Sequence, residues 1–160
     1  MSTVRHFVPK QVLINTYNAY IQPHIDYGLP VWGYTHKTNL IPIERQQRKA
    51  VRIMNFLDKR ADPYPYFKCS NILSLDQSLK LSSSKLLWKA DNQFLPPTVN
   101  SIFNSRNNKS FHVPYRRIDL TQHCISYHGT QVWNRIPLEI RSAKTINSFK
   151  INYKKYLLNQ

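Results

Sequence analysis

The chain has 160 residues, of which 41% are hydrophobic, including 10 Tyr, 7 Phe and 3 Trp. This composition suffices for one domain, or for one domain with a small appendage, and it excludes a disordered basic tail. The 23 Lys and Arg outnumber the 8 Asp and Glu, and the net charge of +15 favours a polyanionic partner, nucleic acid before a membrane surface.

The absence of long apolar runs and the small number of cysteines bear on where the chain is found. No apolar run approaches the roughly 20 residues of a membrane span, and residues 1–15 contain no apolar stretch typical of a signal peptide. We therefore expect an intracellular chain, nuclear or cytoplasmic, that is not secreted and does not enter a membrane. Cys69 and Cys124 are expected to be reduced thiols.

Residues 9–22 predict a first helix, which Pro23 is expected to end or kink. Four aromatic residues follow one another in and after this segment. They suit base stacking, but helical spacing of aromatic residues is more typical of a core, and we interpret them as core. They are Tyr17, Tyr20, Tyr27 and Trp32.

The second helix is predicted from Thr38 or Asn39 to about Phe56, and its two sides differ in character. On a wheel of about 100° per residue, four cations fall within an arc of about 100°. The cations are Arg45, Arg48, Lys49 and Arg52. The opposite side carries Ile43, Gln47, Ala50, Val51 and Met54. One face is therefore predicted to be buried, and the other to face solvent and meet an anion.

Helical patterns continue to about residue 103. Asp62-Pro63 opens a short helix to about Ser70, residues 75–93 form a long one, and Pro96-Pro97 begins a short one to Phe103. Residues 111–115 and 123–127 then read as strands of a hairpin, after a polar linker at 104–110.

Residues 129–136 predict one or two helical turns, and Thr145 begins a last helix. We therefore predict a mainly α fold: a small multi-helix bundle, followed by a short β-hairpin and a C-terminal helix. The predicted domains are residues 1–103 and a small α+β segment of residues 104–160 packed on it.

Three different blocks of residues follow one another along the chain. They are Tyr17-x-x-Tyr20-Ile-x-Pro23-His-Ile-x-Tyr27-Gly28-x-x-x-Trp32-Gly33, then residues 40–53, then Trp133-Asn134-x-Ile136-Pro137-x-x-Ile140-Arg141 with Ser148-Phe149-Lys150. Together they resemble the C-terminal part of reverse transcriptases from non-LTR retrotransposons, the LINE and jockey-like families. The resemblance covers about residues 10–158 and implies a helical thumb, a basic helix and a lysine-rich last segment.

The polymerase of that family needs separated catalytic aspartates, one of them in a Tyr-x-Asp-Asp turn, and this sequence has no Asp-Asp pair. Its eight acidic residues are scattered singly, whereas two-metal phosphoryl transfer needs clustered carboxylates. The resemblance thus implies a non-catalytic fragment that binds template–primer or element RNA. The scattered acids argue equally against a metal-dependent nuclease.

Eight basic residues are the predicted contacts to an RNA or DNA backbone: Arg45, Arg48, Lys49, Arg52, Arg116, Arg117, Lys150 and Lys154. No catalytic residue and no cofactor is expected. Four further residues suggest a metal site, but a zinc knuckle needs three cysteines and this region has one, so no metal is expected either. These four are His112, His123, Cys124 and His128. The alternative function is a protein-interaction module that docks on a polymerase palm or another partner, with the charge serving solubility only.

Overall fold

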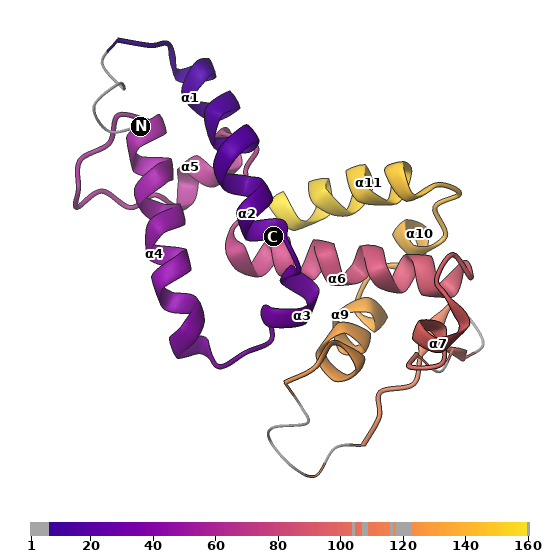
Figure 1. The fold of residues 1–160 in the computed structure, drawn as a ribbon. Helices are drawn as coiled ribbons and strands as arrows, with labels where there is room; N and C mark the ends of the chain where they lie inside the picture. Colours follow the sequence, from indigo (N-terminus) through magenta and orange to yellow (C-terminus); the bar gives the residue numbers. More distant parts are fainter. Residues whose placement is uncertain (1–6, 104, 107–108, 116, 118–122, 160) are drawn as a thin grey trace. The chain divides into compact units, whose positions relative to one another are not determined.

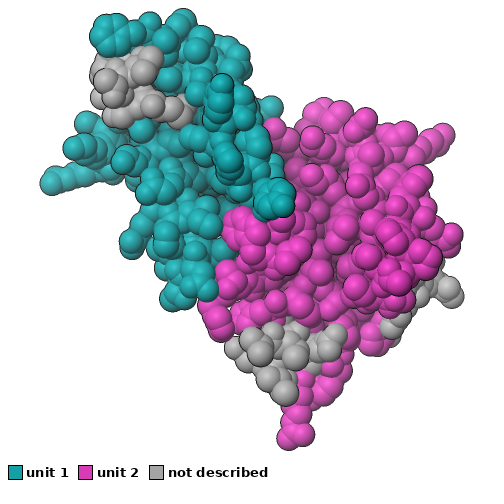
Figure 2. All heavy atoms as spheres, in the orientation of Figure 1, with its two compact units in different colours: residues 1–27, 37–78 teal, residues 28–36, 79–160 magenta. Residues whose placement is uncertain are grey.

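The computed structural model describes residues 7–103, 105–106, 109–115, 117 and 123–159, and this part of the chain is mainly helical (Figure 1). The predicted fold class is confirmed. Residues 1–27 and 37–78 form one compact unit, unit 1, and residues 28–36 and 79–160 form another, unit 2 (Figure 2). The division predicted at residues 103 and 104 falls inside unit 2, and as a domain boundary it stays a prediction.

Unit 1 begins with a helix that does not end at Pro23. Helix α1 (Lys10–Thr16), the π-helix η1 (Tyr17–Ile21) and helix α2 (Gln22–Asp26) follow one another without a break. Proline lacks a backbone N–H and crowds the preceding turn of an α-helix. The wider π-turn ends at Ile21, two residues before Pro23, and α2 continues the helix past the proline.

The core of unit 1 forms where these helices pack against α4 (Lys37–Met54) and α5 (Tyr64–Cys69). Its buried members are Leu13, Tyr17, Ala50, Val51, Met54, Phe67 and Ile72. Three of them come from the apolar side of α4 that the sequence predicts, and Gln47 on that side is also buried. The predicted buried face of this helix is therefore confirmed for these four residues, whereas Ile43 on the same side is half-buried.

A polar pair lies inside this core. The Gln47 side chain donates one hydrogen bond to the Tyr17 hydroxyl at 3.0 Å and another to the carbonyl oxygen of Leu73 at 2.9 Å. Both N–H groups of the amide are thereby used, as buried polar groups require. Burial raises the pKa of Tyr17 to about 12; the bond from Gln47 lowers it and the charge of Asp26 raises it by smaller amounts.

Unit 2 contains most of the remaining elements. They are α3 (Leu29–Trp32), α6 (Leu75–Asp91), of which residues 79–91 belong to unit 2, α7 (Pro97–Asn100), β1 (Ser105–Arg106), β2 (Ser110–Phe111), η2 (Ile125–Gly129), α9 (Thr130–Asn134), α10 (Leu138–Arg141) and α11 (Ile146–Leu158). Figure 1 draws α6 alongside α11, and Thr145 caps α11 by accepting a hydrogen bond from the backbone N–H of Ser148.

The β-hairpin occurs, but not where the sequence places it. β1 and β2 pair antiparallel, Ser105 with Phe111 and Arg106 with Ser110. Residues 125–127 of the expected second strand instead begin the π-helix η2 (Ile125–Gly129). Their β-type composition is a weak preference, and here the segment packs against α3, with His128 stacked on Tyr34. The predicted strand at 123–127 is therefore wrong.

Three side chains clamp the hairpin. The Asn134 amide accepts a hydrogen bond from the backbone N–H of Phe111 at 3.1 Å and donates one to its carbonyl oxygen at 2.8 Å. The indole of Trp133 and the guanidinium of Arg141 both donate to the carbonyl oxygen of Lys109, each at 2.9 Å. Two-residue strands are unstable alone, so these bonds hold the hairpin in place.

Three helices end in the same unusual way. Phe56, Asn71 and Gln93 follow α4, α5 and α6, and all three have positive φ angles, 55°, 53° and 58°. In each case the backbone N–H of this residue bonds three residues back and that of the next residue bonds five residues back. This is the Schellman pattern, in which the left-handed position is usually glycine.

Gly33 occupies a position with no room for a side chain. A Cβ atom there would lie 2.5 Å from Cδ1 of Leu79 and 2.6 Å from the carbonyl oxygen of Leu29. The Leu29 oxygen is backbone and accepts the hydrogen bond of Gly33 N–H at 2.8 Å, so it cannot move aside cheaply. The Trp32-Gly33 pair of the sequence therefore has a packing explanation.

Gly33→Ala should destabilise the protein by about 1–3 kcal/mol, because the added methyl group forces α3 and α6 apart within unit 2. Thermal unfolding followed by circular dichroism measures the change. Asn152→Ala, at an exposed position of α11, is the matched control and should change stability by less than about 0.5 kcal/mol. Equal effects of the two substitutions would contradict the close packing at Gly33.

Tyr17→Phe should make the protein less sensitive to alkaline pH. With a folded-state pKa of about 12 and an ordinary value of 10.0, the folded chain holds this proton more tightly than the unfolded one. The contribution is present in full below pH 10 and is lost as pH rises towards 12, up to about 3 kcal/mol. Urea unfolding of both chains at pH 8 to 11 measures this; parallel declines would contradict the assignment.

Candidate nucleic-acid interface

The cationic side of α4 lies opposite its buried side, but its four members are not equivalent. Arg45 and Lys49 are exposed, whereas Arg48 and Arg52 are half-buried. The helical periodicity of the sequence predicts that all four face solvent. That holds for the first two residues and is wrong in part for the other two, because each of these makes a contact within unit 1.

Arg48 lies between an acid and an aromatic ring. Its Nη2 is 3.2 Å from Oε2 of Glu44, one turn earlier, and both side chains are about one-third exposed. The guanidinium carbon also lies 6.0 Å from the ring centroid of Tyr64 on α5. An exposed pair of this kind contributes little stability, and a guanidinium has five N–H donors, so Arg48 keeps the capacity to contact a phosphate.

Arg52 holds a loop. Its Nε donates a hydrogen bond of 2.8 Å to the carbonyl oxygen of Ala61, in the connection between α4 and α5. The same connection carries Lys59 and Arg60, both exposed, which are not among the eight predicted contacts. Their position directly after a cationic helix was the available signal, although Asp58 and Asp62 balance their charge.

The other predicted contacts belong to unit 2. Arg117 and Lys150 are exposed, Lys154 is half-buried, and Arg116 lies outside the described residues. Burial lowers the pKa of Lys154, and the nearby charge of Lys150 on the same face of α11 lowers it further. Unit 2 carries thirteen of the 23 basic residues and three of the eight acidic ones, a net charge of +10 with histidine neutral.

The four aromatic residues between Tyr17 and Trp32, in and after the first helix, divide between core and surface. Tyr17 is fully buried, as predicted, and Trp32 is half-buried, but Tyr20 and Tyr27 are 71% and 84% exposed. The core interpretation is therefore wrong for these two. Tyr20 lies within the π-helix Tyr17–Ile21, and Tyr27 directly follows α2. The π-turn shifts the helical register and so moves both rings off the face that an unbroken α-helix would bury.

The histidines of unit 2 form a small cluster. The His123 ring lies 4.4 Å from that of His36 and 6.2 Å from that of His128, and its Nδ1 is 2.8 Å from the carbonyl oxygen of Tyr34. His112 is exposed, and Cys124 Sγ lies 3.1 Å from Ser126 Oγ. Among the described residues, no three His, Cys, Asp or Glu side chains are arranged to hold a metal ion.

Comparisons of the chain with models of protein families, with curated proteins and with solved structures found no match. In the described part of the chain, none of the helices combines the length and the apolar character needed to cross a membrane.

A half-buried arginine and an exposed arginine of α4 should differ in their effect on the free energy of unfolding. Arg52→Ala should lower the free energy of unfolding by about 1–2 kcal/mol, because the loop carbonyl of Ala61 loses its charged donor. Arg45→Ala removes an exposed charge from the same helix and should change it by less than about 0.5 kcal/mol. Thermal melts of both variants make the comparison, and a silent Arg52→Ala would show that the loop does not depend on this bond.

Proposed function

We propose that this chain is a non-catalytic nucleic-acid-binding region, related to the thumb and post-thumb part of non-LTR reverse transcriptases. It holds an RNA or DNA backbone, as template–primer or element RNA, against the cationic side of α4. The observation that carries the proposal is the separation of faces on this helix. Arg45 and Lys49 are exposed, while Ala50, Val51 and Met54 on the other side are buried.

The exposed cations of this face suit contacts to phosphates. Lysine and arginine neutralise phosphates and release condensed counterions, which gives affinity without sequence preference. The net charge of +15 adds a long-range attraction for a polyanion. The proposal includes no catalytic step, since the eight acidic residues are scattered singly along the sequence.

The residues that carry the resemblance have structural roles in this chain, which supports the family assignment without testing it. Tyr17 accepts the bond from buried Gln47, Gly33 allows close packing, and Trp133, Asn134 and Arg141 clamp the hairpin. Residues with such roles specify a fold. In the family that the sequence resembles, the corresponding region is a helical thumb, which we expect to hold the nucleic acid.

Exposed aromatic residues favour a second candidate, the protein-interaction module. Phe7, Tyr20 and Tyr27 of unit 1 are among the most exposed large hydrophobic side chains that the structure describes. A palm domain, or another protein partner, would cover them. The two candidates differ in which substitutions matter, because the first depends on the cations of α4 and the second on these rings.

Binding to labelled single-stranded and duplex RNA tests the proposal. If about five phosphates are neutralised, the logarithm of the affinity should fall with the logarithm of salt at a slope of roughly −3.5 to −4.5. Arg45→Glu with Lys49→Glu should lower the affinity at least tenfold, about 1.4 kcal/mol, and leave the thermal melt within a few degrees.

Lys10→Glu with Lys68→Glu is the matched control, since both positions are exposed in unit 1 and the change in net charge is the same. It should cost clearly less affinity than the pair on α4. Equal losses would assign the binding to net charge and not to this face. A salt slope near zero would reject the electrostatic proposal, and loss of a protein partner on Tyr20→Ala alone would favour the second candidate.

A further inference from the structure

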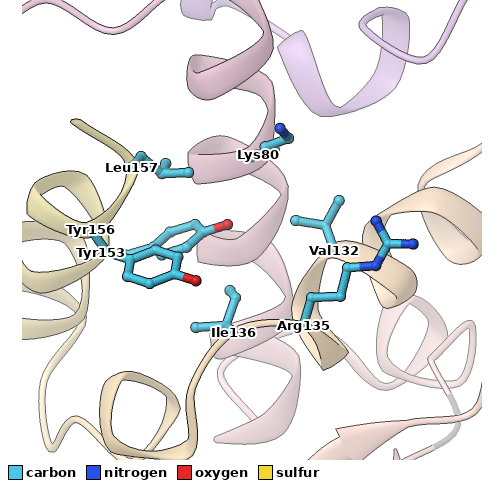
Figure 3. Close-up of a pocket in the computed structure, with 7 residues that line it drawn as sticks. All are labelled: Lys80, Val132, Arg135, Ile136, Tyr153, Tyr156 and Leu157. Atoms are coloured by element: carbon cyan, nitrogen blue, oxygen red, sulfur yellow. The ribbon is translucent and has the colours of Figure 1, made fainter. Parts of the chain in front are cut away.

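Unit 2 contains a pocket of about 180 Å³ between α6, α9 and α11 (Figure 3). Its lining comes from three separate stretches of sequence: Lys80, then Val132, Arg135 and Ile136, then Tyr153, Tyr156 and Leu157. Figure 3 shows the hydroxyl groups of both tyrosines pointing to the side of the pocket that the α9 residues form. Arg135 is exposed, so the pocket opens to solvent beside it.

The lining has the chemistry of a site for an anion joined to a flat ring. Lys80 and Arg135 are cationic, and no described residue that lines the pocket is acidic. Val132, Ile136 and Leu157 add apolar side chains around the pocket, and the tyrosines add two hydroxyl groups (Figure 3). Apolar walls with a few polar groups are typical of small-ligand sites.

A row of stacked rings leads to this pocket. Phe149 and Tyr153 are stacked with their centroids 5.7 Å apart, and Tyr153 and Tyr156 are stacked at 6.1 Å, with planes only 19° apart. Tyr153 is 3% exposed and is fixed within the core, whereas Tyr156 is half-buried and ends the row. The row therefore presents Tyr156 as a preorganised surface on which one more ring can stack.

The size of the pocket limits what enters it. Sites for drug-sized ligands measure about 300–1,000 Å³, so 180 Å³ suits a single base with its phosphate left at the rim. Exposed Arg135 lies at that rim, where a phosphate of the chain can follow the base out to solvent. Aromatic stacking beside arginine and lysine is how proteins hold single strands without reading sequence.

We propose that the pocket takes one unpaired nucleotide of a bound strand, with its base stacked on Tyr156 and its phosphate contacted by Arg135 and Lys80. This inference rests on the proposed function and adds a second, strand-selective contact to the phosphate contacts on α4. A base paired within a duplex cannot enter, since its ring face is covered by its neighbours in the stack.

The test compares labelled uridine oligonucleotides of about 12 residues with blunt RNA duplexes of the same length. Arg135→Gln and Tyr156→Leu should each weaken binding of the single strand about tenfold and binding of the duplex less than threefold. Lys144→Gln removes one exposed charge of unit 2 away from the pocket lining and should change either affinity less than threefold. Circular dichroism melts verify that each variant folds.

Several outcomes overturn the inference. If Arg135→Gln and Lys144→Gln weaken both ligands equally, Arg135 acts only through net charge; if Tyr156→Leu binds the single strand as the parent does, no base stacks there. Uridine 5′-monophosphate that binds the parent but not the pocket variants, with oligonucleotide affinity unchanged, would assign the pocket to a free nucleotide. Arg45→Glu with Lys49→Glu, run in parallel, reports on the α4 proposal independently of the pocket variants.

Discussion

The packing of unit 2 depends on the hydrogen bonds made by the carbonyl oxygen of Lys109 and by the backbone of Phe111 in β2. A hairpin of two-residue strands leaves backbone groups without partners, and buried groups of this kind are costly unless something bonds to them. Trp133, Asn134 and Arg141 supply these bonds from α9 and α10. The same interaction fixes Trp133 among the rings of Phe111 and Phe149, and with it the position of the helices that frame the pocket.

Arg141 shows what this arrangement costs. Its side chain is buried, its Nε has no hydrogen-bond partner, and burial lowers its pKa, with the charge of Asp91 opposing that shift. Burial raises the pKa of Asp91, and the charges of Lys109 and Arg141 counteract it. Arg141 is therefore held by its hydrogen bond to the backbone of Lys109 more than by an ion pair. A directed bond of this kind fixes the position of the hairpin.

The sequence predicts burial and secondary structure well where one local signal dominates, and poorly where contacts between elements determine the outcome. The two sides of α4 follow from helical periodicity, since the buried Ala50, Val51 and Met54 lie within about 100° of one another on the wheel. The exposure of Tyr20 depends on a π-turn, and the helical state of residues 125–129 depends on contacts with α3, neither of which periodicity records. The bond from Arg52 to Ala61 depends on how the loop after α4 turns back on the helix. The pocket at Tyr156 joins residues that are distant along the chain, so only the folded structure brings them together.

The helix ends have a practical consequence for work with this protein. Only 3 of its residues are glycine, and Phe56, Asn71 and Gln93 take the left-handed positions that glycine would occupy without strain. Each non-glycine residue there stores about 1 kcal/mol, least for asparagine. Gln93 is exposed, so glycine at this position relieves strain with little loss of packing, whereas Phe56 is 48% exposed and would lose the contacts of its buried half. Substitution at a helix terminus can therefore raise the stability of the protein without changing its binding surfaces.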